Sequence, residues 1–522
     1  MPDSASKSAE KPTAFVRNAT GLRKNLTFLD AVSLNVGVMS AGPTLAVIGL
    51  TMVLLSSVSG INLVYSTLIS SALVVPLMIL YTMLGRRISR TGGDYVWVSR
   101  AFGGLVGTSA AFTGFVVGTM AFSALSYLSV VFAIGSIGVI FGNASFLPLA
   151  IPGNTPGADT TLQFVVGAII ILLVLGVNIV SAKVGFKLTT VFALFSILAI
   201  IVAIGTLLAN GQTGVQNYVG SLNSAGANVT YSGLANSYTG SSFNLSATLF
   251  IMPLFAIFAY PYLNWSPLVG SELKTGNATR WNAPVAYLIV TVLIAGGLGA
   301  MYYAGGQGFV NIAYSNPNLV YNYSFNFFSM AMGVTGSAIL QWIIALGWIT
   351  SWLAVLMVNM IGIPRYLFAM SFDRSLPSQL SYVSSRLGTP VVGLLSFAIP
   401  TLVLMGLATF LYGTVVSLYG VVVATMAYFV VVGLAAVALA LKSEKGSSKA
   451  ILILCGILTA IVFSYMTYLF FAYPVVWGGN NLAYGFAAGG LIFILAAYLI
   501  SKTYHKRRGI DISMAFKEIP PE

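Results

Sequence analysis

The stretch NVGVMSAGP, residues 35–43, interrupts the first long apolar run of the chain, and YPYLNWSP, residues 260–267, interrupts the sixth. Both stretches are expected to break a helix, because proline lacks an N–H group and glycine weakens helices. Lipid cannot satisfy the backbone groups that a break frees, so they must face protein or a polar cavity. Free N–H groups attract a carboxylate, and free carbonyls attract an ammonium group. One break alone is consistent with a proline kink, whereas two at corresponding positions favour a site for a zwitterion.

Composition places the chain in a bilayer. Of its 522 residues, 57% are hydrophobic and 7% are charged, compared with about 25% charged in a typical soluble domain. This excludes a soluble enzyme, a disordered protein and a nucleic-acid-binding protein. The single cysteine, Cys455, and the single histidine, His505, provide no disulfide, no thiolate metal site and no histidine-based triad. We therefore expect neither an enzyme nor a cofactor.

Twelve apolar runs reach the length of about 20 residues that a membrane helix needs. They are roughly 28–55, 61–84, 102–141, 161–182, 188–208, 247–271, 284–308, 336–371, 390–411, 414–441, 450–471 and 482–501. With the N-terminus inside, all 24 Lys and Arg residues fall on the inner side. Because inner segments carry the positive charge, we expect a multi-pass plasma-membrane protein with both termini in the cytoplasm.

The outer loops are polar and almost uncharged, with Asp159 as their one charged residue. Their four N-x-Ser/Thr sequons begin at Asn143, Asn228, Asn244 and Asn322. These loops are consistent either with ordinary polar connections or with a glycosylated surface facing an acidic medium. An archaeal plasma membrane fits the second interpretation.

The two breaks lie in the first helices of two blocks of five spans each. This divides the chain into a cytoplasmic tail 1–27, a first block 28–208, an extracellular loop 209–246, a second block 247–441, two further helices within 450–501, and a cytoplasmic tail 502–522.

Three stretches resemble the amino acid permeases of the amino acid–polyamine–organocation (APC) superfamily. YTML at 81–84 with RTGGDYVWVSRAFG at 90–103 resembles the loop after helix two of that family. RYLFAM at 365–370, followed by Asp373, Leu376-Pro377 and Gly388-Thr-Pro390, is similar to its segment after helix eight. Residues 258–274 resemble its sixth helix, which ends in a glutamate. The resemblance covers about residues 20–500. It implies an all-α membrane protein of twelve helices, with a LeuT-type five-plus-five inverted repeat and discontinuous helices 1 and 6.

The chain also departs from the family pattern. Met83 stands where the family often has an acid, and Tyr262 stands where helix six usually has glycine, which narrows the expected pocket. Phe192 aligns with a lysine that many proton-coupled relatives have in helix five. That departure weakens the usual proton mechanism.

The candidate site residues follow from the breaks, the resemblance and a few polar positions. For substrate binding they are Val36, Gly37, Ser40, Ala41, Gly42, Phe258, Tyr260, Tyr262, Asn264 and Asn359. For coupling or gating they are Asp30, Glu272, Arg365, Thr350 and Ser351. Phe258 and Tyr260 are open to two interpretations, as gating aromatics or as helix packing.

Two of these groups have competing interpretations. Arg365 lies near the inner end of its span and can reach water, Asp30 or Glu272, either as a gate or as a structural contact. Gly347, Thr350 and Ser351 have the i, i+3, i+4 spacing of a sodium site, although such hydroxyls more often bond the preceding turn. Segment 86–100 is basic and amphipathic, and we expect it at the membrane surface beside anionic lipid head groups.

These features predict a secondary active transporter that moves an amino acid by alternating access. A neutral substrate is favoured, because the breaks carry no acid or base to pair a charged side chain. The partners would be the amino acid, a proton or sodium ion, and membrane lipids. Proton coupling is favoured; sodium coupling, exchange-type amino acid or polyamine transport, and an ion channel are the alternatives.

Overall fold

The computed structural model describes residues 26–518 except 57, 152, 154, 155, 275, 276, 323, 385, 386, 413, 414 and 444. The N-terminal tail predicted for 1–27 and the last residues of the C-terminal tail therefore lie largely outside the described residues.

Eleven helical segments of the described part are long and apolar enough to cross a membrane. They are Phe28–Leu55 (α1, α2 and η1), Leu63–Arg87 (α3), Gly104–Ile140 (α5, η2 and α6), Thr160–Val180 (α8), Ala182–Leu222 (α9), Asn282–Gly305 (α15), Ala338–Phe372 (α18), Val391–Leu411 (α19 and η8), Leu418–Lys442 (η9 and α20), Gly446–Ala472 (α21) and Asn481–Lys506 (α22). The described residues form no strand beyond two isolated bridges.

The sixth predicted span, 247–271, is present in pieces. It consists of α11 (Leu245–Phe250), α12 (Met252–Phe258), the four-residue helix α13 (Trp265–Leu268) and the single turn η5 (Gly270–Glu272). Each piece is too short to cross a bilayer alone. This segment therefore accounts for the difference between the twelve predicted spans and the eleven long helices.

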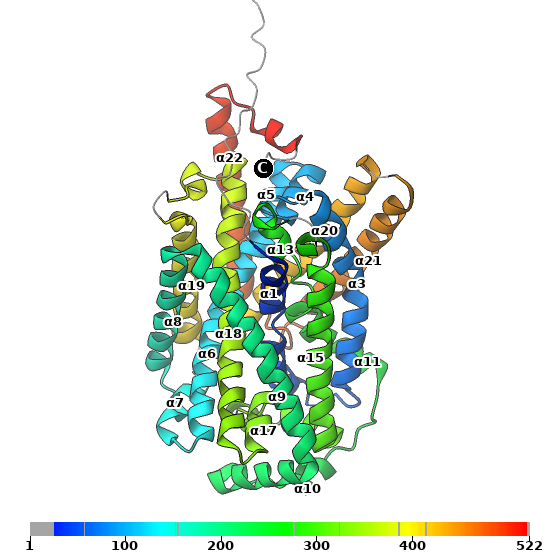
Figure 1. Ribbon diagram of the computed structural model, residues 1–522, viewed down its shortest axis with the longest axis vertical. Coiled ribbons are helices and arrows are strands. Elements are labelled where there is room, and N and C mark those ends of the chain that lie inside the picture. Colours follow the sequence, from blue (N-terminus) through cyan, green and yellow to red (C-terminus); the bar gives the residue numbers. More distant parts are fainter. Residues whose placement is uncertain are drawn as a thin grey trace, which may run out of the picture.

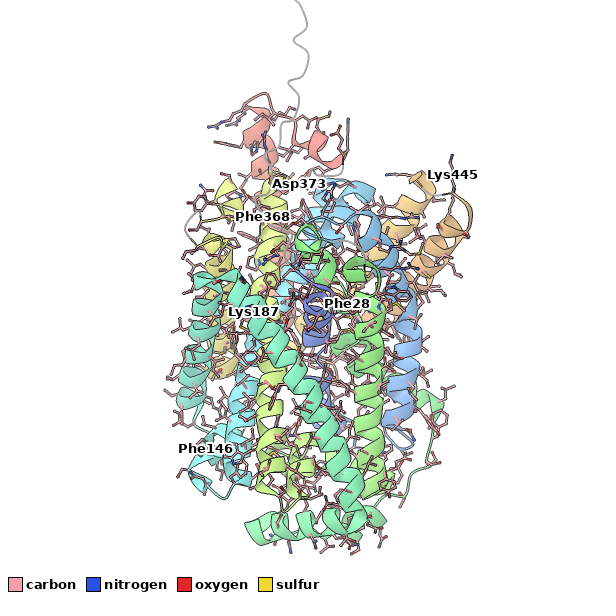
Figure 2. All side chains as sticks on the ribbon, viewed as in Figure 1. Phe28, Phe146, Lys187, Phe368, Asp373 and Lys445 are labelled. Atoms are coloured by element: carbon pink, nitrogen blue, oxygen red, sulfur yellow. The ribbon has the colours of Figure 1, made fainter. Side chains whose placement is uncertain are left out.

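The helices form a bundle around α1 (Phe28–Met39), which contacts α9, α15 and α18 (Figure 1). Helices α8 and α19 lie along one edge, and α3 and α21 along the other. Figure 2 shows Asp373 and Lys445 at one end and Phe146 near the opposite end. We call the first the basic end and the second, where Asn143 begins a sequon, the sequon end.

The outer helices expose apolar side chains in a way that only lipid can cover. Leu173 of α8 is 64% exposed and Ile500 of α22 is 69% exposed. By contrast, most residues of the inner helices α1, α2 and α18 are buried. A soluble protein rarely exposes apolar surface on this scale, so the outer helices require a bilayer.

The segment predicted as an extracellular loop, 209–246, contains helices. The element labelled α9 consists of two helices that meet at Gly211, whose non-helical φ of 50° favours glycine, and the second helix ends at Leu222. Val215, Tyr218 and Val219 are buried at helical spacing beyond that bend. The short helix α10 (Tyr231–Asn236) follows within the same segment. The uncharged polar composition gave no sign of the second helix in the sequence, because only three apolar residues on one face pack it against the protein.

Segment 86–100 contains the helix α4 (Asp94–Phe102), and its position at the membrane surface stays a prediction. Helix α4 buries Tyr95 and Trp97 completely. The turn before it depends on Gly92, where φ is 97° and an added Cβ would lie 2.5 Å from the Cβ of Ala369. The apolar face of α4 is therefore an internal contact, whereas Arg86 and Arg87, earlier in the segment, are exposed.

The packing of α18 on α13 predicts a stability effect at Gly362. A Cβ at this position would overlap the ring of Trp265, so Gly362→Ala should cost about 1–3 kcal/mol through overpacking. We expect a lower Tm for the purified variant in detergent.

The matched control is Gly205→Ala in α9, where no atom lies within 4 Å of the added Cβ. This variant should keep or raise the Tm, because alanine favours a helix more than glycine does. Equal Tm values for Gly362→Ala and the unmodified chain would contradict the packing described here.

Candidate functional site

The first helix breaks at Ser40. Helix α1 ends at Met39, Ser40 has φ 50° in the left-handed region, and α2 (Ala41–Met52) begins at the next residue. Pro43 has no N–H group, so it cannot donate to the carbonyl of Met39 as a helix interior requires. Backbone groups are therefore freed in the middle of a membrane-crossing segment.

The second break faces the first. Helix α12 ends at Phe258, and no helix is present from there until α13 begins at Trp265. The Ser40 hydroxyl donates to the Phe258 carbonyl oxygen at 3.0 Å. This hydrogen bond joins the two interruptions, which are more than two hundred residues apart in the sequence.

Asn35 holds the two broken segments together on the basic side of this contact. Its Oδ1 accepts from the Ser266 N–H at 3.0 Å, and its Nδ2 donates to the Ser266 hydroxyl at 2.9 Å. The Ser266 hydroxyl in turn donates to Asn282 Oδ1 at 2.6 Å. All three residues are buried, so this polar network fixes α13 and α15 against α1.

A narrow pocket lies on the sequon side of the first break. Its walls come from α2, η1 (Val53–Leu55), α6 (Gly118–Ile140), α12, α18, η9 (Val415–Val422) and the segment after α21. They are formed by Ser40, Pro43, Thr44, Val47, Leu50, Thr51, Leu54, Phe122, Leu125, Phe258, Trp352, Tyr419 and Val476. No residue that lines it is charged. Thr44 Oγ1 and the Tyr419 hydroxyl are buried and have no hydrogen-bond partner among the described residues, so both can bond a ligand.

A second, smaller cavity lies behind the break, toward α9 and α18. Val36, Gly37, Ala41 and Gly42 line it together with Ser351. Its volume is about 10 Å³, at or below what one water molecule occupies. Gly42 is required here, because an added Cβ would lie 2.6 Å from Ser351 Cβ.

The predicted sodium group is only partly assembled at this cavity. The Ser351 hydroxyl donates to the Trp348 carbonyl at 2.7 Å, and the Thr350 hydroxyl donates to the Gly347 carbonyl at 3.2 Å. Both hydroxyls therefore bond the preceding turn of α18. Gly347 instead provides space for Ala199 of α9. Ser351 lines the cavity, whereas Gly347 and Thr350 do not.

Four other predicted residues of the substrate site do not line the pocket. Tyr260 bonds Thr67 of α3 at 2.5 Å between hydroxyl oxygens, and Tyr262 stacks on Phe122 with ring centroids 6.3 Å apart. The other two are amides: Asn264 Nδ2 donates to the Tyr366 hydroxyl at 3.0 Å, and Asn359 Nδ2 donates to Ser123 Oγ at 3.0 Å. Asn264 and Asn359 each keep a buried Oδ1 without a partner among the described residues.

Arg365 pairs with Glu272, one of the two carboxylates predicted to be within its reach. Arg365 Nε lies 2.5 Å from Glu272 Oε1, Nη2 lies 3.0 Å from Oε2, and both side chains are buried. Asp30 instead accepts from the Thr27 N–H and hydroxyl and from the Thr190 hydroxyl. Glu272 thus clamps η5 to α18, and Asp30 caps the start of α1.

A second ion pair joins the two loop signatures of the sequence. Arg100 forms a bidentate contact with Asp373, with Nη1 2.6 Å from Oδ2 and Nη2 3.1 Å from Oδ1. The Tyr95 hydroxyl donates to the same carboxylate at 3.0 Å. This contact ties α4 to the end of α18 at the basic end.

Asp94 lies at the centre of a third polar group at the basic end. Its Oδ2 accepts from the Tyr81 hydroxyl at 2.6 Å, and its Oδ1 accepts from the Tyr366 hydroxyl. The Tyr428 hydroxyl faces the same carboxyl. Burial raises the pKa of Asp94 from 3.8 to about 6, and the hydrogen bonds from the tyrosines limit that rise.

The sequence prediction included two residues of the pocket wall, Ser40 and Phe258, and missed the other wall residues and the Asp94 group. Thr44 follows the first break directly and could have been found there. Phe122 and Tyr419 lie in uniformly apolar spans, where no pattern separates a pocket wall from packing. Asp94 was noticed as part of a signature, but only the fold surrounds it with tyrosines from other helices.

A bundle of membrane-crossing helices with two facing breaks around a pocket is the architecture of a membrane transporter. The family model for amino acid permeases matches residues 26–495. The chain therefore belongs to the amino acid permease family of the APC superfamily, as its signatures indicated. No protein among the curated ones matches it.

The buried pair of Arg365 and Glu272 predicts a strong stability effect. Glu272→Gln leaves a buried guanidinium without its counter-charge, which should cost about 3–5 kcal/mol. The double variant Glu272→Leu, Arg365→Met removes both charges and should recover most of the lost Tm. Thermal unfolding in detergent measures both. A single variant as stable as the unmodified chain would show that the pair is not a structural clamp.

Proposed function

We propose that this permease moves a neutral amino acid across the plasma membrane by alternating access. The observation that carries the proposal is the contact of the two broken helices, through Ser40 and Phe258, at the inner end of the pocket. The pocket lies on the sequon side of this contact, while three buried polar groups tie the helices together on the basic side. This arrangement corresponds to one half of an alternating-access cycle.

The backbone at the first break suits the carboxylate of an amino acid. Helix α2 has 12 residues, and the N–H groups of Ala41 and Gly42, which line the smaller cavity beside the pocket, have no partner within the helix. Such groups and the positive end of the helix dipole attract an anion. The carbonyls at the ends of α1 and α12 suit the ammonium group.

A neutral side chain suits the rest of the pocket. Its walls are mainly apolar and aromatic, with Phe122, Phe258 and Trp352 beside the hydroxyls of Thr44 and Tyr419. A charged side chain would be buried without a counter-ion, which costs several kcal/mol. This argument also disfavours a polyamine as substrate.

The positive-inside rule makes the basic end cytoplasmic and the sequon end extracellular. Asn143, Asn228 and Asn244 are exposed and Asn322 is partly buried, so the first three are accessible for glycosylation. The substrate would then enter from the outside in the state described here.

Proton coupling is the favoured mode, with sodium coupling and exchange as the alternatives. The hydroxyls of Thr350 and Ser351 bond their own helix. This favours a proton over sodium. Glu272 and Asp30 were the predicted proton carriers, but each has a structural role in the contacts above.

Uptake into proteoliposomes tests the substrate class. We expect accumulation of labelled alanine, leucine or phenylalanine, and weaker competition by arginine and glutamate, because the pocket lacks a charged residue. Transport of none of these amino acids would contradict the proposed function. Stronger competition by arginine or glutamate would contradict the neutral substrate.

An imposed pH gradient tests the coupling ion. In sodium-free buffer, acid outside and alkaline inside should drive uptake above the level of liposomes without a gradient, and a protonophore should abolish the difference. Uptake that does not respond to the pH gradient and requires sodium would favour sodium coupling over proton coupling. Uptake that depends only on an amino acid inside the liposomes would establish exchange.

A further inference from the structure

The carboxylate of Asp94 differs from the other buried acids at the basic end. Glu272 and Asp373 each pair with an arginine. Asp94 is fully buried, and the side chains that bond it among the described residues are neutral tyrosines. A buried carboxylate whose partners are all neutral is far more costly in its charged form than one beside an arginine.

Neutral groups face Asp94 from the elements packed around it. Tyr81 comes from α3, Tyr366 from α18 and Tyr428 from α20. The charged and titratable groups nearby face elsewhere: Tyr95 and Arg100 contact Asp373, Arg365 contacts Glu272, and Lys442 donates to the Ala101 carbonyl. Asp94 is therefore the residue of this group whose charge changes when a proton binds or leaves.

The same group is connected to the broken helix. Asn264 lies directly before α13, and its Nδ2 donates to the Tyr366 hydroxyl, which in turn donates to Asp94. Tyr81 completes a chain of hydrogen bonds from the second break to α3. Opening of the basic end must separate these elements and admit water to the carboxyl.

We propose that Asp94 binds the transported proton while the basic end is closed and releases it when that end opens to water. This inference rests on the proposed function, because it names the proton site of the same path. The proposed proton carrier is thus Asp94 and not Glu272 or Asp30, because Asp94 makes no ion pair among the described residues.

The difference in the pKa of Asp94 between the closed and the open state determines how pH shifts the equilibrium between these states. In the closed state burial holds the pKa of Asp94 at about 6, and water entry would return it toward the ordinary value of 3.8. The closed state therefore binds the proton on the order of 100-fold more tightly than the open state. Acid favours closure, and loss of the proton above about pH 6 favours opening.

A cysteine reporter in the full chain tests this without any substrate. Ser271 is buried at the basic end, where its hydroxyl bonds the hydroxyl of Thr91. The thiol of Ser271→Cys, in a Cys455→Ala background, therefore reports the opening of that end. The rate of labelling by a water-soluble maleimide is measured in nanodiscs from pH 5 to 8. Each rate is divided by that of the same protein unfolded in SDS, which removes the pH dependence of the thiol itself.

With Asp94 present, this ratio should rise several-fold between pH 5 and 7.5 with a midpoint near 6. In Asp94→Asn the normalised labelling rate should stay low at every pH, because the neutral amide resembles the protonated acid. Asp94→Glu should keep the rise. The matched control Asp30→Asn changes another acid of the same end and should also keep it.

A ratio that stays flat with Asp94 present, or that still rises in Asp94→Asn, would overturn the proposal. If Asp94→Asn does not fold, Tyr366→Phe decides: loss of one donor to the charged form should move the midpoint to higher pH, and an unchanged midpoint would overturn the proposal. Because labelling needs no amino acid, failed uptake with a normal pH response would contradict the proposed function alone. Normal uptake with a flat response would contradict the role of Asp94 alone.

Discussion

The structure depends on one constraint, which is that a backbone broken inside a bilayer must find its partners within the protein. The Phe258 carbonyl, freed at the end of α12, finds its partner in the side-chain hydroxyl of Ser40. The hydrogen bonds of Asn35 with Ser266 fix the same two segments one turn further toward the basic end. The helices packed around α1 keep lipid away from this region, and the pocket lies where they leave the backbone accessible.

The basic end meets a similar constraint with charges. Two arginine–carboxylate pairs tie α18 to η5 and to α4, and each buries both partners in a bidentate contact. Such pairs add specificity of arrangement more than net stability. Asp94 lies in the same region without an arginine, so its charge is sensitive to the entry of water. Closure of this end and protonation of one acid are thereby linked.

Much of the fold could be predicted from the sequence, because hydropathy and helix breakers act locally. Apolar runs identified the membrane-crossing helices, and glycine and proline identified both breaks. The end of α9 and the burial of α4 could not be predicted from charge and polarity. In both cases a few apolar residues, such as Val215 and Trp97, meet partners that are distant in the sequence. The pocket walls other than Ser40 and Phe258 were missed for the same reason: Phe122 and Tyr419 are ordinary residues of apolar spans until the fold brings them to the break.

The central claim is that the amino acid binds at the first break, between α2 and α12. A cryo-electron microscopy map of the permease in nanodiscs with a saturating neutral amino acid tests it directly. The account predicts ligand density against the first N–H groups of α2, bordered by Thr44 and Phe258. A continuous helix through Ser40, or ligand density away from both breaks, would contradict it.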